Sequence, residues 1–146
     1  MFTSSDMRKP DILVVDDDPV DRKLIKAAFK DAGNRVTLHF CEDGMSALNF
    51  LKRSGDFAAA PVPKACLVDI NMPGISGIEL LSLMKYDDKI RHIPVTMFSS
   101  SDQHSDVSKC YEGQACGYVK KPDNNQEMSQ IADTLTKYWT ETVTLP

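Results

Sequence analysis

Short apolar runs alternate with longer segments of helical periodicity along this chain. Runs of a few apolar and β-branched residues are typical of buried strands, and apolar residues every three or four positions are typical of helices. The pattern predicts five strands, at residues 12–15, 36–40, 65–68, 93–98 and 117–119. It predicts helices at residues 19–32, 44–52, 76–86, 103–115 and 125–139, and a loop at 53–64. Such alternation predicts an α/β protein, with a doubly wound parallel sheet between helices on both faces.

The first helix has clear boundary signals. Asp18 and Pro19 read as its N-cap and first helical residue, and Gly33-Asn34 ends it. Helical spacing puts Val20, Leu24, Ala28 and Asp31 on one face of this helix, with Ile25, Phe29 and Ala32 beside it. At the other end of the chain, Tyr138 and Trp139 either close the last helix on the core or form a partner surface.

Polar side chains follow four of the predicted strands. They are Asp16, Asp17 and Asp18 after the first, Asp69 after the third, Ser99 after the fourth and Lys121 after the fifth. In doubly wound folds the functional site lies at the carboxyl ends of the strands. We therefore expect these side chains to converge on one small area.

The chemistry of this set points to a metal and a phosphoryl group. Neighbouring carboxylates repel one another, and a cation relieves that repulsion. Oxygen ligands suit Mg²⁺, so we expect Asp16, Asp17 and Asp69 to hold it, with the backbone carbonyl of Asn71. Asp69 stands alone before a Pro-Gly loop, and a carboxylate can accept a phosphoryl group, so we predict that it is the nucleophile. Ser99 and an ammonium would neutralise the phosphoryl oxygens.

Several of these residues also have an explanation that involves structure alone. The aspartates at 16–18 could form only a cap and turn at a helix N-terminus, where negative charge is favoured. Asp69 could be a loop acid before a proline turn. Tyr118, in a short edge strand, could be a half-buried packing residue.

Taken together, the motifs resemble the receiver domain of two-component response regulators. They are Asp16-Asp17, the stretch DINMPG at 69–74 with Gly77, PVTMFSS at 94–100, and Lys121-Pro122. The resemblance implies a flavodoxin-like fold with five strands in the order 2-1-3-4-5. It also implies a single receiver domain over residues 1–146, with a core at about 10–140 and a tail at 141–146.

The resemblance also assigns roles. A histidine kinase would transfer a phosphoryl group to Asp69. Asp17 and Asp69 would bind Mg²⁺ directly and Asp16 through water. Ser99 and Lys121 would contact the phosphoryl oxygens, and Tyr118 matches the aromatic position that turns inward on activation. The chain departs from the family at Asp123, where an aromatic residue is common. Asn71 and Ser101 occupy positions that tune the lifetime of the acyl phosphate.

A narrower resemblance concerns the kinase. The loop at 53–64, the stretch IPVTMFSSS and the ending at 138–146 are similar to those of small stand-alone regulators that partner phytochrome-type kinases. This implies a red-light signalling kinase as donor and a homodimer through the last strand and helices. Output would pass to an unknown downstream protein or to a histidine phosphotransferase.

Composition narrows the function classes. The chain has 146 residues and a net charge of −4 without a basic run, which argues against nucleic-acid binding. Its apolar runs are too short to span a membrane and its N-terminus does not read as a signal peptide, so we expect a cytoplasmic protein. The cysteines show no zinc-ligand spacing and read as reduced, mostly buried thiols: Cys41, Cys66, Cys110 and Cys116.

Two other functions fit these residues less well. An aspartyl-phosphate phosphatase would need a second acid beside its nucleophile and a cap domain, so we expect no enzyme beyond self-phosphorylation and self-dephosphorylation. A flavin mononucleotide binder needs a phosphate loop after the first strand, where three aspartates stand instead. A phosphorelay intermediate and a receiver-like scaffold that is never phosphorylated remain as alternatives.

Overall fold

The computed structural model describes residues 8–146, and these residues form helices around a parallel sheet. The strands are β1 (Asp11–Val15), β2 (Thr37–Cys41), β3 (Ala65–Val68), β4 (Val95–Ser99) and β5 (Gly117–Lys120). Their order across the sheet is β2-β1-β3-β4-β5, and every neighbouring pair is parallel. The predicted doubly wound sheet and its strand order are therefore confirmed.

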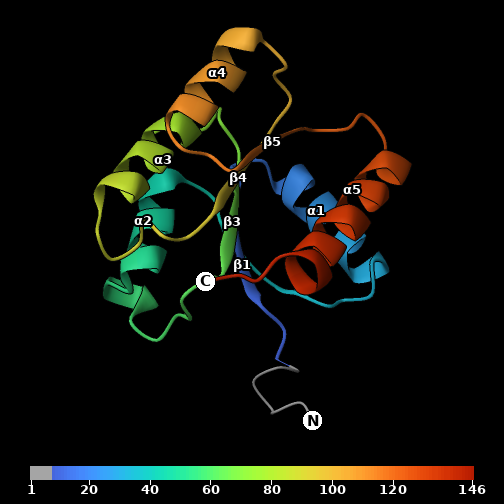
Figure 1. Cartoon of the computed structure of the whole chain (residues 1–146), viewed down its shortest axis with the longest axis horizontal. Helices are drawn as coiled ribbons and strands as arrows, with labels where there is room; N and C mark the ends of the chain where they lie inside the picture. The colour runs from blue at the N-terminus through green and yellow to red at the C-terminus, as the bar shows by residue number, and fades with distance from the viewer. Residues whose placement is uncertain (1–7) are drawn as a thin grey trace.

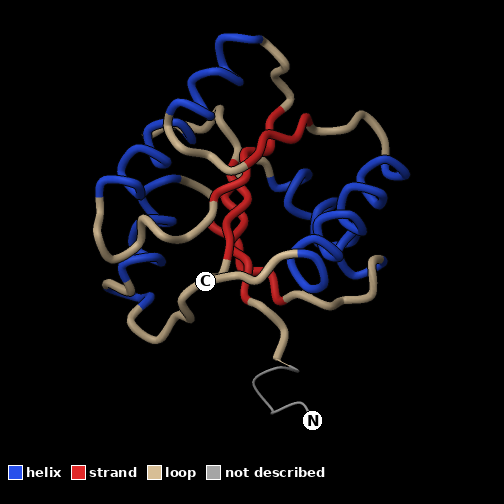
Figure 2. Tube along the Cα trace, in the orientation of Figure 1, coloured by secondary structure: helices blue, strands red, loops and turns tan. Residues whose placement is uncertain are grey.

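The helices cover both faces of this sheet. They are α1 (Pro19–Asp31), α2 (Gly44–Lys52), α3 (Gly77–Tyr86), α4 (His104–Glu112) and α5 (Asn125–Lys137). In Figure 1, α1 and α5 lie on one side of the sheet, and α2, α3 and α4 lie on the other. Figure 2 shows the same layers, with the strands seen nearly edge-on between the two groups of helices.

Each face of the sheet has its own apolar core, because side chains alternate along a strand. Leu13 and Cys66 belong to the cluster that packs against α2 and α3, whereas Ile12 and Leu67 belong to the cluster that packs against α1 and α5. All four residues of β3 are buried. A strand covered on both faces reads as a continuous apolar run, and this run carries the chain directly to Asp69.

Only some of the apolar residues of α1 are buried. Ile25, Ala28 and Phe29 are buried, but Val20 is 62% exposed and Leu24 is 38% exposed. α1 packs against one helix, α5, and against one face of the sheet. Only the residues that face these neighbours are buried, so the buried face of α1 is narrower than its apolar face.

Other boundaries also differ from the prediction. The last helix ends at Lys137 and is followed by a π-helical turn, η2 (Tyr138–Thr142). Trp139 is buried in this turn and stacks on Phe29 of α1 at a centroid distance of 6.1 Å. Stacking draws the indole onto the core and leaves Tyr138 42% exposed. The predicted loop at 53–64 contains a short 3₁₀ turn, η1 (Gly55–Phe57).

None of the helices at residues 8–146 has the length and apolar character needed to cross a bilayer.

The four cysteines are free, and only Cys116 is exposed. Burial raises the pKa of the Cys66 thiol to about 12 and that of Cys41 to about 11, so thiolate is scarce at both positions. We expect iodoacetamide to modify Cys116 rapidly in the native protein and to reach the other three thiols only after unfolding. Peptide mass spectrometry would locate the modified residue, and Cys116→Ser should abolish the rapid phase. Rapid labelling of Cys41 or Cys66 in the folded chain would contradict this.

Candidate functional site

The three aspartates after β1 lie in three different environments. Asp16 is buried, whereas Asp17 and Asp18 are exposed. Oδ1 of Asp18 accepts a hydrogen bond from the backbone N–H of Val20 at 2.8 Å, which caps α1 as predicted. Oδ1 of Asp16 accepts from the N–H of Asp18 at 2.9 Å. The turn thereby fixes the Asp16 carboxylate at the sheet end while α1 begins.

Asp16, Asp17 and Asp69 form one carboxylate group. Their ligand oxygens lie within 4.8 Å of one another, and Asp69 follows β3, the strand next to β1. Oδ2 of Asp16 is buried and receives no hydrogen bond from the described residues, although Lys121 Nζ lies 2.7 Å away in an ion pair. A donor set made only of carboxylate oxygens, two of them from buried residues, fits a hard divalent cation such as Mg²⁺.

Lys121 lies in the middle of these acids. Its Nζ is 2.7 Å from Oδ2 of Asp16, 3.1 Å from Oδ2 of Asp69 and 2.7 Å from Oδ2 of Asp21. The preceding Lys120 points outward and pairs with exposed Asp102 at 3.0 Å. Strand alternation therefore sends Lys121 inward, as expected for the lysine before Pro122.

Asp21 was missed by sequence reasoning. It is an acidic residue in the first turn of α1, and such residues are common because they favour the helix dipole. The signal that could have found it is its spacing: Asp21 lies one helical turn after the aspartate triplet, so it returns to the same end of the sheet.

Burial and charge act against each other in this cluster. Burial raises the pKa of Asp16 and of Asp69, and the Lys121 ammonium opposes that rise. Burial alone would lower the pKa of Lys121, but its contacts with Asp16, Asp21 and Asp69 outweigh burial and raise it. Lys121 therefore stays an ammonium, and the carboxylates exceed it in number.

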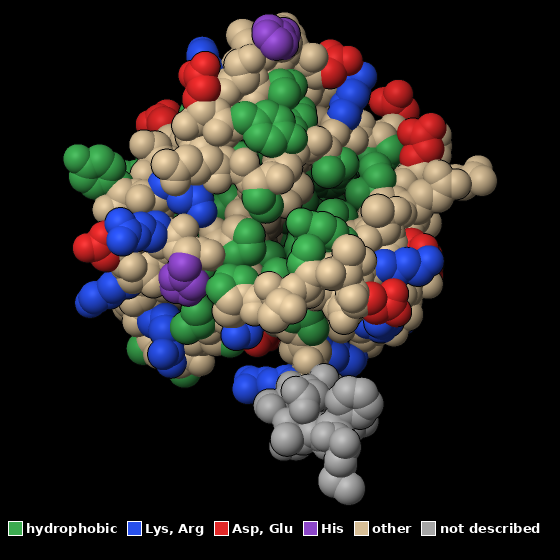
Figure 3. Space-filling model, in the orientation of Figure 1, with side chains coloured by type: hydrophobic (Ala, Val, Ile, Leu, Met, Phe, Trp, Pro, Cys, Tyr) green, Lys and Arg blue, Asp and Glu red, His purple; other side chains and the backbone are tan. Residues whose placement is uncertain are grey.

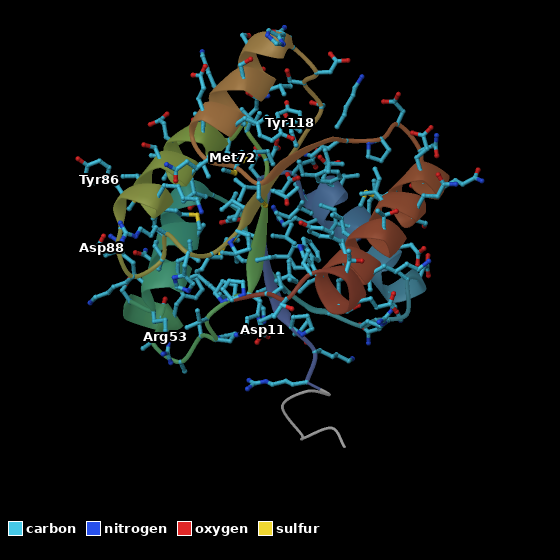
Figure 4. The ribbon with its side chains drawn as sticks, in the orientation of Figure 1. Asp11, Arg53, Met72, Tyr86, Asp88 and Tyr118 are labelled. Carbon is cyan, nitrogen blue, oxygen red and sulfur yellow. The ribbon has the colours of Figure 1, made fainter. Side chains whose placement is uncertain are left out.

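The remaining predicted residues form a second group at the ends of β4 and β5. Ser99 is fully buried, and it is the last residue of β4, although the strand was predicted to end one residue earlier. Its Oγ accepts a hydrogen bond from the N–H of Ser101 at 3.3 Å. Tyr118 of β5, which is labelled in Figure 4, donates its hydroxyl to the carbonyl of Ser101 at 2.6 Å. The backbone at Ser101 thus connects Ser99 with Tyr118.

Ser101 also connects this group to α4, because its hydroxyl donates to Oδ2 of Asp106 at 2.6 Å. Asn71 is exposed in the loop after Asp69, and the role of its carbonyl stays a prediction.

Gly77 packs directly against the backbone of Asp69. The N–H of Gly77 donates to the carbonyl of Ile70 at 2.8 Å, and a Cβ at Gly77 would overlap with the carbonyl oxygen of Asp69. Ser76 and Glu79 form a capping box that starts α3 at this point. α3 can therefore begin this close to the Asp69 backbone only because its first residue, Gly77, has no side chain.

The raised pKa values of Asp16 and Asp69 predict an unusual pH dependence of stability. Between the ordinary value of 3.8 and the raised values, the native state holds more protons than the unfolded chain. The contribution of these two acids to stability therefore falls as pH rises through that range. We expect a double variant, Asp16→Asn with Asp69→Asn, to gain stability relative to the wild type as pH rises from about 4 to about 7. Urea unfolding of both proteins in EDTA would measure this, and a constant or shrinking difference would contradict it.

Comparisons with known proteins agree with this architecture. Residues 12–133 match the family model of the response regulator receiver domain. The response regulator Rcp1 of Synechocystis sp. is 31% identical over 135 residues, which cover 92% of this chain and 92% of Rcp1.

Two solved structures are also similar. The phosphorylated cyanobacterial phytochrome response regulator RcpA superposes with a TM-score of 0.89 at 30% identity, over 95% of this chain and 99% of that one. The response regulator RPA3017, in red light signaling of R. palustris, superposes with a TM-score of 0.88 at 28% identity, over 94% and 98%. With its fold, its strand-end carboxylates and these matches, the chain belongs to the family of response regulator receiver domains.

Proposed function

We propose that this chain is a cytoplasmic response regulator that accepts a phosphoryl group from a histidine kinase on Asp69. The observation that carries the proposal is the juxtaposition of Asp16, Asp17 and Asp69 with the Lys121 ammonium at the carboxyl ends of the strands. The alternative, in which the aspartates at 16–18 form only a cap and turn, does not require Asp69 and Lys121 to lie beside them. Asp18 alone caps α1.

The proposed transfer uses groups that are already in place. A carboxylate oxygen of Asp69 bonds to phosphorus while the bond from phosphorus to the donor's imidazole nitrogen breaks, and its electron pair stays on the imidazole. Lys121, 3.1 Å from Asp69, and the Ser99 hydroxyl would neutralise the phosphoryl oxygens. Asp16, Asp17, Asp69 and the Asn71 carbonyl would hold Mg²⁺, which when bound supplies further positive charge for these oxygens.

The proposed switch runs from Ser99 to Tyr118. Adding a phosphoryl group adds about 1.5 to 2 negative charges at this end of the sheet, and a shift of Ser99 would reach Ser101 through their hydrogen bond. Ser101 in turn contacts Tyr118 and Asp106 of α4. The surface formed by α4, β5 and α5 is therefore the proposed output surface, where a downstream protein or a histidine phosphotransferase would bind.

A homodimer through this same surface is part of the proposal. β5 is an edge strand of the sheet, and Gly117, Tyr118 and Val119 are only partly buried. Apolar side chains gather along the middle of the face shown in Figure 3, between the α4 and α5 sides of the molecule. The relatives named for phytochrome or red-light signalling support a phytochrome-type kinase as the phosphoryl donor.

Acetyl phosphate provides a direct test, read by intact-protein mass spectrometry with and without Mg²⁺. We expect the wild type to gain one phosphoryl group only with Mg²⁺, and Asp69→Ala to gain none. Asp88→Ala is the matched control, because Asp88 is an exposed aspartate after α3 (Figure 4). Phosphorylation of Asp69→Ala would disprove the choice of nucleophile. A wild type that is never phosphorylated would favour the receiver-like scaffold.

A further inference from the structure

Asp21 contacts the proposed phosphorylation site without belonging to the carboxylate group that fits a metal. Its side chain is 31% exposed, and its Oδ2 accepts a hydrogen bond from Lys121 Nζ at 2.7 Å. The carboxylate group is formed by Asp16, Asp17 and Asp69. Asp21 therefore reaches the site through Lys121.

We propose that Asp21 is a positioning residue, which holds the Lys121 ammonium toward α1 and so leaves Asp16 and Asp69 available to Mg²⁺. The inference rests on the function proposed above, because it concerns the same site. It adds a fourth carboxylate to that site and gives it a role distinct from metal binding.

The distances indicate how the charge of Lys121 is shared. An ammonium has three N–H donors and no acceptor, and Lys121 faces three carboxylates. The contact with Asp21 is as short as that with Asp16 and shorter than the 3.1 Å contact with Asp69. Without the Asp21 charge, the ammonium would pair with Asp16 and Asp69 alone. Both are proposed metal ligands, so Lys121 would then compete with Mg²⁺ more strongly.

A small cavity gives the ammonium room on the side of Asp21. It has a volume of about 60 Å³ and is lined by Asp21, Lys121, Phe98, Pro122 and Met128 among others. Lys121 Nζ also lies 5.9 Å from the centroid of the Phe98 ring, a distance at which the ring attracts a cation. On the α1 side the ammonium therefore has free volume, the Asp21 carboxylate and the Phe98 ring as neighbours.

Magnesium affinity tests this role without any phosphoryl donor. Isothermal titration calorimetry of the full chain with MgCl₂ should give a dissociation constant about tenfold weaker for Asp21→Asn than for the wild type. Asp123→Asn is the matched control, because Asp123 is exposed on the rim of the same cavity. We expect it to stay within about twofold of the wild type, since exposed charges are screened. Circular dichroism would check that both variants are folded.

A double-mutant cycle with Lys121 distinguishes two roles of Asp21. Asp21 could affect Mg²⁺ by positioning Lys121 or by the direct attraction of its own charge. In a Lys121→Met background the competing ammonium is gone, so Asp21→Asn should change Mg²⁺ affinity by less than about threefold. A tenfold effect that persists in this background would show that Asp21 acts by its own charge, and would overturn the proposal. So would wild-type affinity in Asp21→Asn. Phosphorylation of the wild type by acetyl phosphate is a separate measurement, so failure of the proposed function would be recognised independently.

Discussion

Gly77→Ala should lower the free energy of unfolding by about 3 kcal/mol and sharply reduce phosphorylation of Asp69. An added Cβ would overlap with the carbonyl oxygen of Asp69, and it would lie 2.8 Å from both the Asp69 carbonyl carbon and the Ile70 Cα. These are backbone atoms, so no side-chain rotation relieves the overlap. Either α3 or the loop that carries Asp69 has to move, and the second movement would misplace the proposed nucleophile.

Gly117→Ala is the appropriate control for this experiment. At Gly117 the nearest atoms to an added Cβ are those of the Thr96 side chain, at 3.6 and 3.7 Å, which is ordinary van der Waals contact. We expect a change in stability within about 1 kcal/mol there, because nothing has to shift. Urea unfolding measures both variants. Equal stability of the two would show that the start of α3 is free to move away from Asp69.

The strands were predictable because their chemistry is local. Residues 65–68 are a continuous apolar run that is too short for a helix and follows a loop with Gly and Pro, which together identify a strand buried on both faces. The end of the last helix was not predictable in the same way. Trp139 is placed by stacking on Phe29, which lies far away in sequence, and this contact accompanies the change from α5 to a π-helical turn. The exposed positions of Val20 and Leu24 also depend on which elements happen to cover α1.

The site residues also fall into those that could be predicted from the sequence and those that could not. The rule that strand ends converge located Asp16, Asp69 and Lys121, because the parallel sheet alone brings them together. The role of Asp21 could not be predicted, because it depends on where the Lys121 side chain points. The sequence pattern of α1 contains no information on that direction. The contact between Tyr118 and the Ser101 carbonyl was likewise beyond the sequence, since it depends on the path of the loop after β4.

Lys121→Met should destabilise the metal-free protein by about 3 kcal/mol. The Lys121 side chain is 12% exposed, and the partners Asp16 and Asp69 are 2% and 9% exposed, so removing the ammonium leaves buried carboxylates without their cation. Methionine has a similar length and stays compatible with Phe98, so the loss reports charge more than packing. Urea unfolding in EDTA at neutral pH would measure it.

The neighbouring lysine supplies the control. Lys120→Met removes an exposed ion pair with Asp102, which is expected to contribute at most about 1 kcal/mol. Lowering the pH toward 4 should shrink the deficit of Lys121→Met, because burial raises the pKa of Asp16 and of Asp69 and both protonate first. Mg²⁺ should shrink it too, since a cation bound by the same carboxylates takes over the task of the lost ammonium. If Lys121→Met and Lys120→Met were equally stable at neutral pH, the acids would not depend on Lys121 for their burial.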